Sequence, residues 1–209
     1  MPTVTRRTLL ASSAVAVAAT AVRAQQPAAK PPFGFCLNTS TIRIGEGQWG
    51  KPRPILDSIA VASKAGYTAI EPWIQELDEF TKGGGTLADL KKRFADAGLA
   101  VPDCIGFAEW LVEDADRRKK GLETAKRDME KVVAVGGVRI AAPPVGATAG
   151  GSKRDDPKFS EPVSAMLAAN RYGELLDLGK TMGVTPIVEV WGHSKSLGKF
   201  GETVLAAWE

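Results

Sequence analysis

The sequence predicts an α/β protein built as a partial (β/α)8 TIM barrel of about five βα units, preceded by a signal peptide. Short apolar segments alternate five times with segments of helical periodicity, which favours a parallel sheet with helical crossovers. Each return from a helix to the next strand is short and contains glycine. The connections from strand to helix are long, at 40–52, 72–85, 108–117 and 143–163. This asymmetry is typical of a barrel whose elaborated loops gather at the carboxyl ends of its strands.

The first two units show the pattern clearly. Residues 33–37 form an apolar strand candidate, and residues 55–64 place apolar side chains at helical spacing. Gly66 ends that helix, and the second strand follows at 67–71. The connection after this strand is expected to be a loop that runs to Gly85.

The later units repeat the pattern. Thr86 is a suitable N-cap for a helix at 86–97, which is followed by a strand at 99–107. The long helix at 118–135 carries apolar residues on one face and charge on the other. The remaining strands and helices are predicted at 138–142, 164–182, 184–190 and 195–208.

The N-terminus has the parts of a secretory signal. Arg6 and Arg7 precede a weakly hydrophobic, alanine-rich stretch, and small residues flank Arg23 at the expected cut. Paired arginines in this setting indicate the twin-arginine route to the periplasm or the outside, the alternative being a general signal with two chance arginines. The apolar stretch is too short to span a bilayer comfortably, so no stable membrane anchor is expected. The predicted organisation is a twin-arginine-type signal peptide, a spacer and an incomplete barrel, at 1–24, 25–32 and 33–209.

Composition and charge exclude several classes of protein. Hydrophobic residues make up 44% and charged residues 24% of the 209, and there are two cysteines, which argues against disorder and against a disulfide scaffold. Lys and Arg number 27 and Asp and Glu 24. Three arginines lie in residues 1–24, which hold no acid, so the remainder carries 24 of each sign. A neutral domain of this kind gives no reason to expect a nucleic-acid partner.

Length predicts that the barrel is incomplete. The residues from 33 to 209 hold five of the eight units that a barrel needs, and the sequence stops within a helical pattern. The expectation is an N-terminal fragment with two open sheet edges, which would aggregate or oligomerise through those edges when expressed alone.

Two glutamates follow predicted strands in apolar surroundings. Glu189 lies within the run Pro-Ile-Val-Glu-Val-Trp-Gly, where an ionised carboxylate needs a cation or a strong hydrogen-bond partner. A divalent metal ion would supply it, and the alternative is an Arg or Lys inside the barrel. Glu71 has similar surroundings, and a structural hydrogen bond or salt bridge is equally open for it.

The remaining candidates are aromatic or imidazole side chains. His193 is the only histidine, which excludes a zinc site with several histidines, and its place after a strand favours substrate contact over a structural role. Four tryptophans lie in segments that follow strands, namely Trp49, Trp73, Trp110 and Trp191. They would suit stacking on the CH groups of a sugar, and ordinary core filling is the alternative.

Four segments together resemble the xylose isomerase-like TIM barrel family: 66–74, 136–144, 169–172 and 188–194. The resemblance implies a divalent metal (Mn²⁺, Mg²⁺, Co²⁺ or Zn²⁺) whose first ligand is a glutamate at the end of strand five, a position that Glu189 matches. It places the other three ligands, an Asp, a His and a Glu, on strands six to eight, which this sequence lacks. No metal is therefore expected to bind this chain tightly. In the family, two glutamates relay a proton beside a carbonyl through an enediolate, and the second of them is missing here.

The resemblance implies a metal-dependent isomerase or epimerase of a small sugar or sugar phosphate, here truncated and inactive alone. In that role Glu189 would be the catalytic residue and metal ligand, and the sugar or polyol would contact Glu71, Trp73, Trp191 and His193. The alternative is a non-catalytic, exported carbohydrate-binding barrel, so enzyme activity stays open. Metal-binding residues at three further strand ends would favour the enzyme. A nuclease of the same family is disfavoured because no histidine precedes His193.

Overall fold

The computed structural model describes residues 33–45, 50–145, 162–192 and 194–208. The chain divides into two units, Met1–Phe33 and Gly34–Glu209, and all of the described helices and strands lie in the second. The predicted signal peptide and spacer therefore fall outside the described residues.

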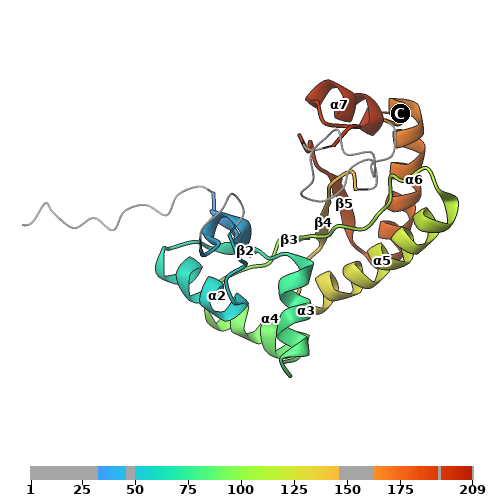
Figure 1. Ribbon diagram of the computed structural model, residues 1–209. Helices are drawn as coiled ribbons and strands as arrows, with labels where there is room; N and C mark the ends of the chain where they lie inside the picture. The colour runs from blue at the N-terminus through green and yellow to red at the C-terminus, as the bar shows by residue number, and fades with distance from the viewer. Residues whose placement is uncertain (1–32, 46–49, 146–161, 193, 209) are drawn as a thin grey trace, which may run out of the picture. The chain divides into compact units, whose positions relative to one another are not determined.

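The second unit alternates strands with helices (Figure 1). Its strands are β1 (Cys36–Asn38), β2 (Ala69–Glu71), β3 (Asp103–Ile105), β4 (Arg139–Ala142) and β5 (Thr185–Val188). A 3-10 helix, η1 (Thr39–Ile42), follows β1. The α-helices are α2 (Ile55–Lys64), α3 (Ile74–Lys82), α4 (Leu87–Asp96), α5 (Ala115–Ala134), α6 (Ala165–Met182) and α7 (Phe200–Trp208).

The strands run parallel in chain order. β1 pairs with β2, and β4 pairs with both β3 and β5. Two isolated parallel bridges, Ala69 to Ala100 and Trp73 to Ile105, join β2 to the third strand segment. Pro102 lies between these bridges and has no N–H to donate, which interrupts the ladder there. The predicted parallel α/β architecture of a partial barrel is confirmed.

Each strand presents one face to the helices and one to the concave side of the sheet. Successive side chains in a strand point to opposite faces. The central residues of the strands are buried under the helices, namely Leu37, Ile70, Cys104, Ile140 and Pro186. The residues on either side of each of these therefore lie on the opposite, inner face.

Helix α3 was not expected, because residues 72–85 look like a loop by length and glycine content. Trp73 is the N-cap, and the side chain of Glu76 accepts a hydrogen bond from its backbone N–H at 2.9 Å. Ile74 and Leu77 then bury the apolar face of a nine-residue helix. The predicted glycine at the helix-to-strand return is confirmed at Gly183, which caps α6 in the left-handed region at φ 66°.

Gly179 allows α6 to approach β5 closely, and we expect Gly179→Ala to lower the free energy of unfolding by about 1–3 kcal/mol. An added Cβ would lie 2.4 Å from the carbonyl oxygen of Val184 and 2.6 Å from Cδ of Pro186. Gly173 of the same helix is the matched control, because a Cβ there meets nothing within 4 Å. Gly173→Ala should raise stability by about 0.5–1 kcal/mol, since alanine favours the helix. Urea unfolding curves of the two variants would contradict this explanation if both shifted in the same direction.

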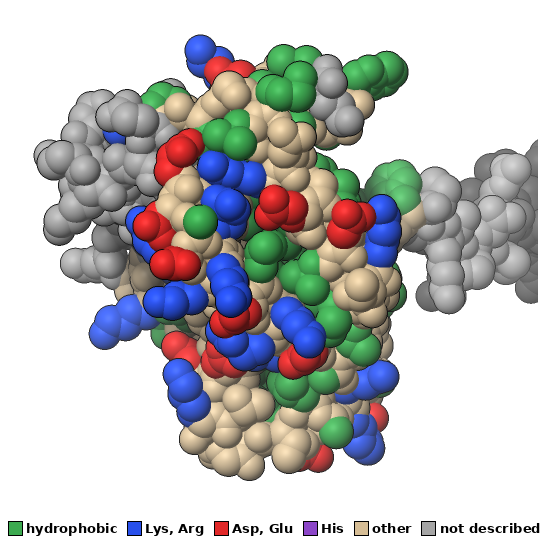
Figure 2. Space-filling view, turned by 90° about the vertical axis from the view of Figure 1, so that its right-hand side faces the viewer, with side chains coloured by type: hydrophobic (Ala, Val, Ile, Leu, Met, Phe, Trp, Pro, Cys, Tyr) green, Lys and Arg blue, Asp and Glu red, His purple; other side chains and the backbone are tan. Residues whose placement is uncertain are grey.

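Oppositely charged side chains intermingle on the face drawn in Figure 2, where Lys and Arg alternate with Asp and Glu. Lys92 and Asp96 of α4 form one of the exposed ion pairs of the described residues, at 2.6 Å. Among the described residues, no helix combines the length and the apolar character needed to cross a bilayer.

Candidate functional site

The inner face of the sheet carries the carboxylates that the sequence singles out. Glu71 is the last residue of β2, and Glu189 directly follows β5. By the alternation of the strands, both lie on the face opposite the helices. Asp103 of β3 lies on the same face, opposite Arg139 in the β3–β4 register. The face of the sheet opposite the helices therefore carries charged side chains from β2, β3 and β4 and from the residue after β5.

The carboxylate of Glu71 is held by a neighbouring strand. Asn38 of β1 pairs with Glu71 in register, and its Nδ2 donates to Oε2 of Glu71 at 2.6 Å. Burial raises the pKa of Glu71, and the negative charge of Asp103 raises it further. The hydrogen bond from Asn38 opposes this shift, and the charge of Glu189 adds to it.

Glu189 lies on the same face of the sheet as Glu71. The two residues belong to strands separated by β3 and β4, yet the charge of Glu189 contributes to the raised pKa of Glu71. Burial also raises the pKa of Glu189 itself. No described Lys or Arg forms an ion pair with its carboxylate, so within the described residues the alternative of an internal salt bridge finds no support.

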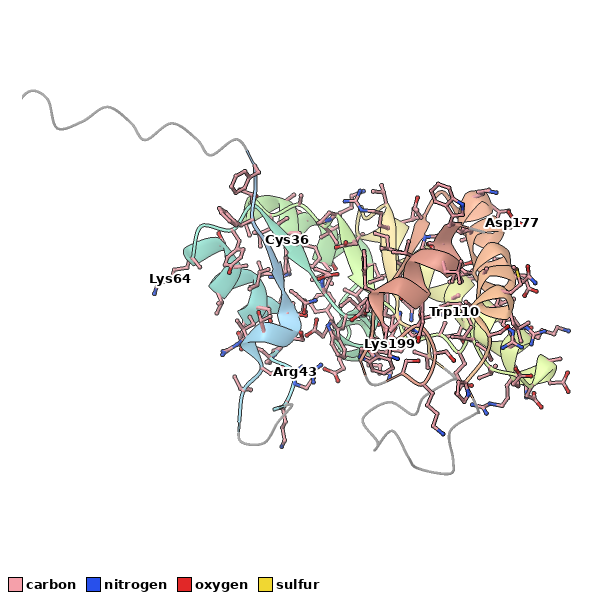
Figure 3. The ribbon with its side chains drawn as sticks, turned by 90° about the horizontal axis from the view of Figure 1, so that it is seen from above. Cys36, Arg43, Lys64, Trp110, Asp177 and Lys199 are labelled. Carbon is pink, nitrogen blue, oxygen red and sulfur yellow. The ribbon has the colours of Figure 1, made fainter. Side chains whose placement is uncertain are left out.

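Three aromatic rings form a row along the carboxyl ends of the strands. The ring centroids of Trp73 and Phe107 lie 4.8 Å apart, and those of Phe107 and Trp191 lie 6.3 Å apart. We call these three residues the aromatic row. The guanidinium carbon of Arg43, labelled in Figure 3 at the end of η1, lies 4.4 Å from the centroid of Trp73. Phe107 was missed by the sequence analysis, because a single phenylalanine near a strand end looks like core.

A buried glutamate fixes the first ring of this row. Oε2 of Glu76 accepts hydrogen bonds from Oγ1 of Thr39 at 2.7 Å and from the backbone N–H of Trp73 at 2.9 Å. Glu76 is only 4% exposed, and burial raises its pKa. This carboxyl ties the segment after β1 to the segment after β2. Glu76 supplies the glutamate half of a capping box, and a glutamate at the third helical position is the sequence signal that could have revealed it.

Three candidates from the sequence remain, namely Trp110, Trp49 and His193. Trp110 belongs to the core rather than to the inner face, because it is 1% exposed and its Nε1 donates to the carbonyl of Pro143 at 2.8 Å. Trp49 and His193 lie outside the described residues. The structure thus brings Glu71, Trp73, Glu189 and Trp191 to one side of the sheet.

The described residues do not form a metal site by themselves. Within them, no three His, Cys, Asp or Glu side chains lie close enough together to hold a metal ion. Carboxylates suit a hard divalent cation, but such sites need several protein ligands. Glu189 alone is not a fit for a resident metal.

We expect Glu71→Gln to raise stability at pH 7 relative to the natural chain. A raised carboxyl pKa means that the folded state binds the proton more tightly than the unfolded state, whose reference value is 4.5. The stability that protonation provides is complete below that value and is lost as the pH rises through the folded pKa. The advantage of the variant should therefore vanish near pH 3.5, at about one unit below the reference value.

Urea unfolding at several pH values measures the effect of Glu71→Gln. Glu123→Gln, at an exposed position of α5, controls for the change in net charge. A constant difference between the Glu71 variant and the natural chain at all pH values would contradict the electrostatic explanation.

Comparison with known proteins places this geometry in context. A family model described as xylose isomerase-like TIM barrel matches residues 59–209. No curated protein sequence matched the chain. Among solved structures, L-ribulose 3-epimerase has a TM-score of 0.60 and 19% identity, over 84% of this chain and 56% of that one.

Two further solved structures are similar. The IolI protein with a binding zinc atom has a TM-score of 0.56 and 18% identity, over 75% of this chain and 51% of that one. The 3-keto-D-glucoside 4-epimerase YcjR from E. coli has a TM-score of 0.52 and 18% identity, over 73% of this chain and 54% of that one. At these identities the likeness establishes the fold, and the chain spans about half the length of these structures.

Proposed function

The chain belongs to the xylose isomerase-like TIM barrel family, and on this premise we propose that it forms part of a sugar isomerase or epimerase. The reaction would move a proton between neighbouring carbons of a small sugar, next to a carbonyl group. Two of the similar solved structures are epimerases of sugar compounds, which supports this choice of reaction class.

The observation that carries the proposal is the pair of glutamates on the face of the sheet that also carries the aromatic row. Burial raises the pKa of Glu189 and of Glu71 from the ordinary value of 4.5. A carboxylate with a raised pKa accepts and returns a proton more effectively near neutral pH. In this proposal Glu189 moves the proton, and Glu71, oriented by Asn38, binds hydroxyl groups of the sugar.

The aromatic row provides the apolar side of sugar recognition. Aromatic faces pack well against the CH groups of a sugar ring. Arg43 covers one face of Trp73, and Phe107 lies against the same residue. The sugar would therefore stack mainly on Phe107 and Trp191, with His193 as a further proposed contact.

The proposal includes the dependence of the reaction on a divalent metal ion. A bound divalent metal would supply stabilisation of the negative charge that develops on the substrate oxygens. The zinc atom of the similar IolI structure supports such a role in the whole enzyme. Because the described residues alone do not fit a metal, we assign no step to it here.

Export is proposed from the N-terminal sequence alone. The paired Arg6 and Arg7 and the apolar stretch after them support delivery by the twin-arginine route. The substrate would then be a sugar of the periplasm or the surrounding medium.

Saturation-transfer NMR with free ketoses, among them D-fructose and L-ribulose, tests the recognition half of this proposal. Irradiation of the aromatic protons should transfer saturation to sugar CH protons, and Trp191→Ala should reduce the transfer severalfold. Trp208→Ala is the control, since that ring is 86% exposed at the end of α7 and forms no part of the aromatic row. Equal transfer in both variants, or no transfer from the folded natural chain to any sugar, would contradict the proposed site.

The second candidate is a non-catalytic carbohydrate-binding barrel, which the aromatic row alone would support. It predicts the same saturation transfer without any exchange of carbon-bound protons. The exchange experiment that separates the two candidates is argued in the Discussion.

A further inference from the structure

The orientation of the Asn38 side-chain amide is fixed by the turn that follows β1. Asn38 is the N-cap of η1, and its Oδ1 accepts hydrogen bonds from the backbone N–H of Ser40 at 2.9 Å and from the hydroxyl of Ser40 at 2.6 Å. A backbone N–H can only donate, so the side-chain atom that it contacts is the amide oxygen. The amide nitrogen of Asn38 is therefore the atom that reaches β2.

This orientation distinguishes the two oxygens of the Glu71 carboxyl. Nδ2 of Asn38 donates to Oε2 of Glu71 at 2.6 Å, and the two residues are partners in the β1–β2 register. Because a carboxyl O–H oxygen is a poor acceptor, a proton on Glu71 is held on Oε1. Among the described residues, Glu71 forms no hydrogen bond through Oε1. Oε1 is thus left for a ligand on the inner face of the sheet.

We infer that Glu71 is a second catalytic residue, which holds on Oε1 the proton that the carbonyl oxygen of the substrate takes up. The inference deepens the proposed function, on which it rests, because that proposal gives Glu71 only a binding role. Asn38 and Ser40 are then positioning residues, since they act on the substrate only through Glu71. The ligand class is a small hydroxy ketone or hydroxy aldehyde in its open-chain form.

The surroundings of Glu71 favour the protonated form that this role needs. Burial raises the pKa of Glu71, and the negative charges of Asp103 and of Glu189 raise it further. The hydrogen bond from Asn38 opposes this effect only in part, since the net shift of the pKa is upward. A carboxyl group that keeps its proton can donate a hydrogen bond to an oxygen on which negative charge develops.

The proposed step moves two protons and returns both. Glu189 takes the proton from the carbon next to the carbonyl, and the electron pair of that C–H bond forms the C=C bond of an enediol. The π electrons of the carbonyl move to its oxygen, which takes the proton from Oε1 of Glu71. Glu189 then gives its proton to the former carbonyl carbon. The proton of the other enediol oxygen passes to Oε1, and the new carbonyl forms at that oxygen, so both carboxyls end in their starting forms.

Replacement of Glu71 by glutamine separates donation from acceptance. Asn38 would donate to the amide oxygen of the new side chain, whose amide nitrogen takes the place of Oε1 and can only donate. We expect Glu71→Gln to bind L-erythrulose within about twofold of the natural chain, and Glu71→Ala to bind it about tenfold more weakly. A four-carbon 2-ketose has no hydroxyl placed to close a five- or six-membered ring, so its carbonyl is free. Saturation-transfer NMR titrations of the full chain give the dissociation constants.

Two further variants control this experiment. Glu79→Gln, at an exposed position of α3, should bind L-erythrulose like the natural chain. Asn38→Asp replaces the donor to Oε2 by a carboxylate oxygen, which draws the proton of Glu71 to Oε2 and leaves Oε1 as an acceptor. The affinity of Asn38→Asp for L-erythrulose should therefore fall about tenfold, as in Glu71→Ala.

A measurement on the natural chain covers the case in which these variants fail to fold. When L-erythrulose is added at neutral pH, the side-chain carboxyl ¹³C resonance of Glu71 should move toward its position in acid, because the carbonyl oxygen binds the protonated form. A resonance that stays at its ionised position in the complex would overturn the inference.

The variants distinguish failure of this inference from failure of the proposed function. Equal weakening in Glu71→Gln and Glu71→Ala would overturn the inference and leave Glu71 as an acceptor of sugar hydroxyls. An unchanged affinity in Glu71→Ala would also overturn it, because Glu71 would then not touch the sugar. No saturation transfer from the folded natural chain to L-erythrulose would contradict the proposed function itself, and the inference with it.

Discussion

Trp110→Ala should destabilise the protein by about 3–5 kcal/mol, a large share of the total stability of a domain of this size. The indole is 1% exposed and packs against Tyr172. Removing it would leave a cavity and take the indole donor from the carbonyl of Pro143. Both losses act on the contact between β4 and α6. Chemical denaturation at neutral pH measures the change in the free energy of unfolding.

Trp110→Phe separates the volume of the ring from its hydrogen bond. Phenylalanine fills much of the space but cannot donate to Pro143, so a loss of about 1–3 kcal/mol is expected. Trp208→Ala, at a position 86% exposed, should change stability by less than about 0.5 kcal/mol. If Trp110→Ala were as mild as Trp208→Ala, the assignment of Trp110 to the core would be wrong.

Trp110 also shows how far the sequence can predict a site. Position along the chain placed it after a strand, where substrate contact and core filling are both reasonable. The deciding fact is that its indole N–H reaches Pro143, 33 residues away. A contact of that range depends on how β3 and β4 align. The residues around Trp110 do not by themselves specify that alignment.

Helix α3 and the aromatic row illustrate the same limit. The strands and the other α-helices follow from local periodicity and from glycine at the returns, and their order and type are confirmed. Their lengths are less accurate, since the strand predicted at 99–107 is only Asp103–Ile105 and the helix predicted at 195–208 begins at Phe200. Helix α3 depends on Glu76, whose carboxyl is held by Thr39 of the preceding unit. Phe107 becomes part of the row only because Trp73 and Trp191 converge on it. Local patterns predict elements, whereas side chains that meet across strands need the fold.

The two glutamates could be identified because their signal is local. A carboxylate at the end of an apolar strand is costly unless something compensates for its burial. Glu71 and Glu189 both satisfy that pattern, and the structure places them on one face.

In a barrel completed by three further βα units, Glu189→Gln should slow exchange of the substrate's carbon-bound proton with solvent by about 10²–10⁴-fold. Glutamine keeps the size of the side chain but cannot take up a proton at neutral pH. The three further units could come from a similar solved structure such as L-ribulose 3-epimerase. Deuterium uptake at the carbon next to the carbonyl, followed by NMR in D2O with diamagnetic Mg²⁺ present, measures the rate.

Glu174→Gln is the matched control for Glu189→Gln. Glu174 lies on α6 with its side chain 51% exposed, and its Oε2 lies 3.8 Å from Nε of Arg118, away from the inner face. The Glu174→Gln variant should leave both the exchange of the carbon-bound proton and sugar binding unchanged. The catalytic proposal requires that Glu189→Gln still binds sugar through the aromatic row while exchange is lost, because the rings and the carboxylate act on different atoms. Sugar binding by the completed barrel with no exchange in any variant would instead establish the non-catalytic carbohydrate-binding barrel. Exchange at the natural rate in Glu189→Gln would remove Glu189 from the chemistry.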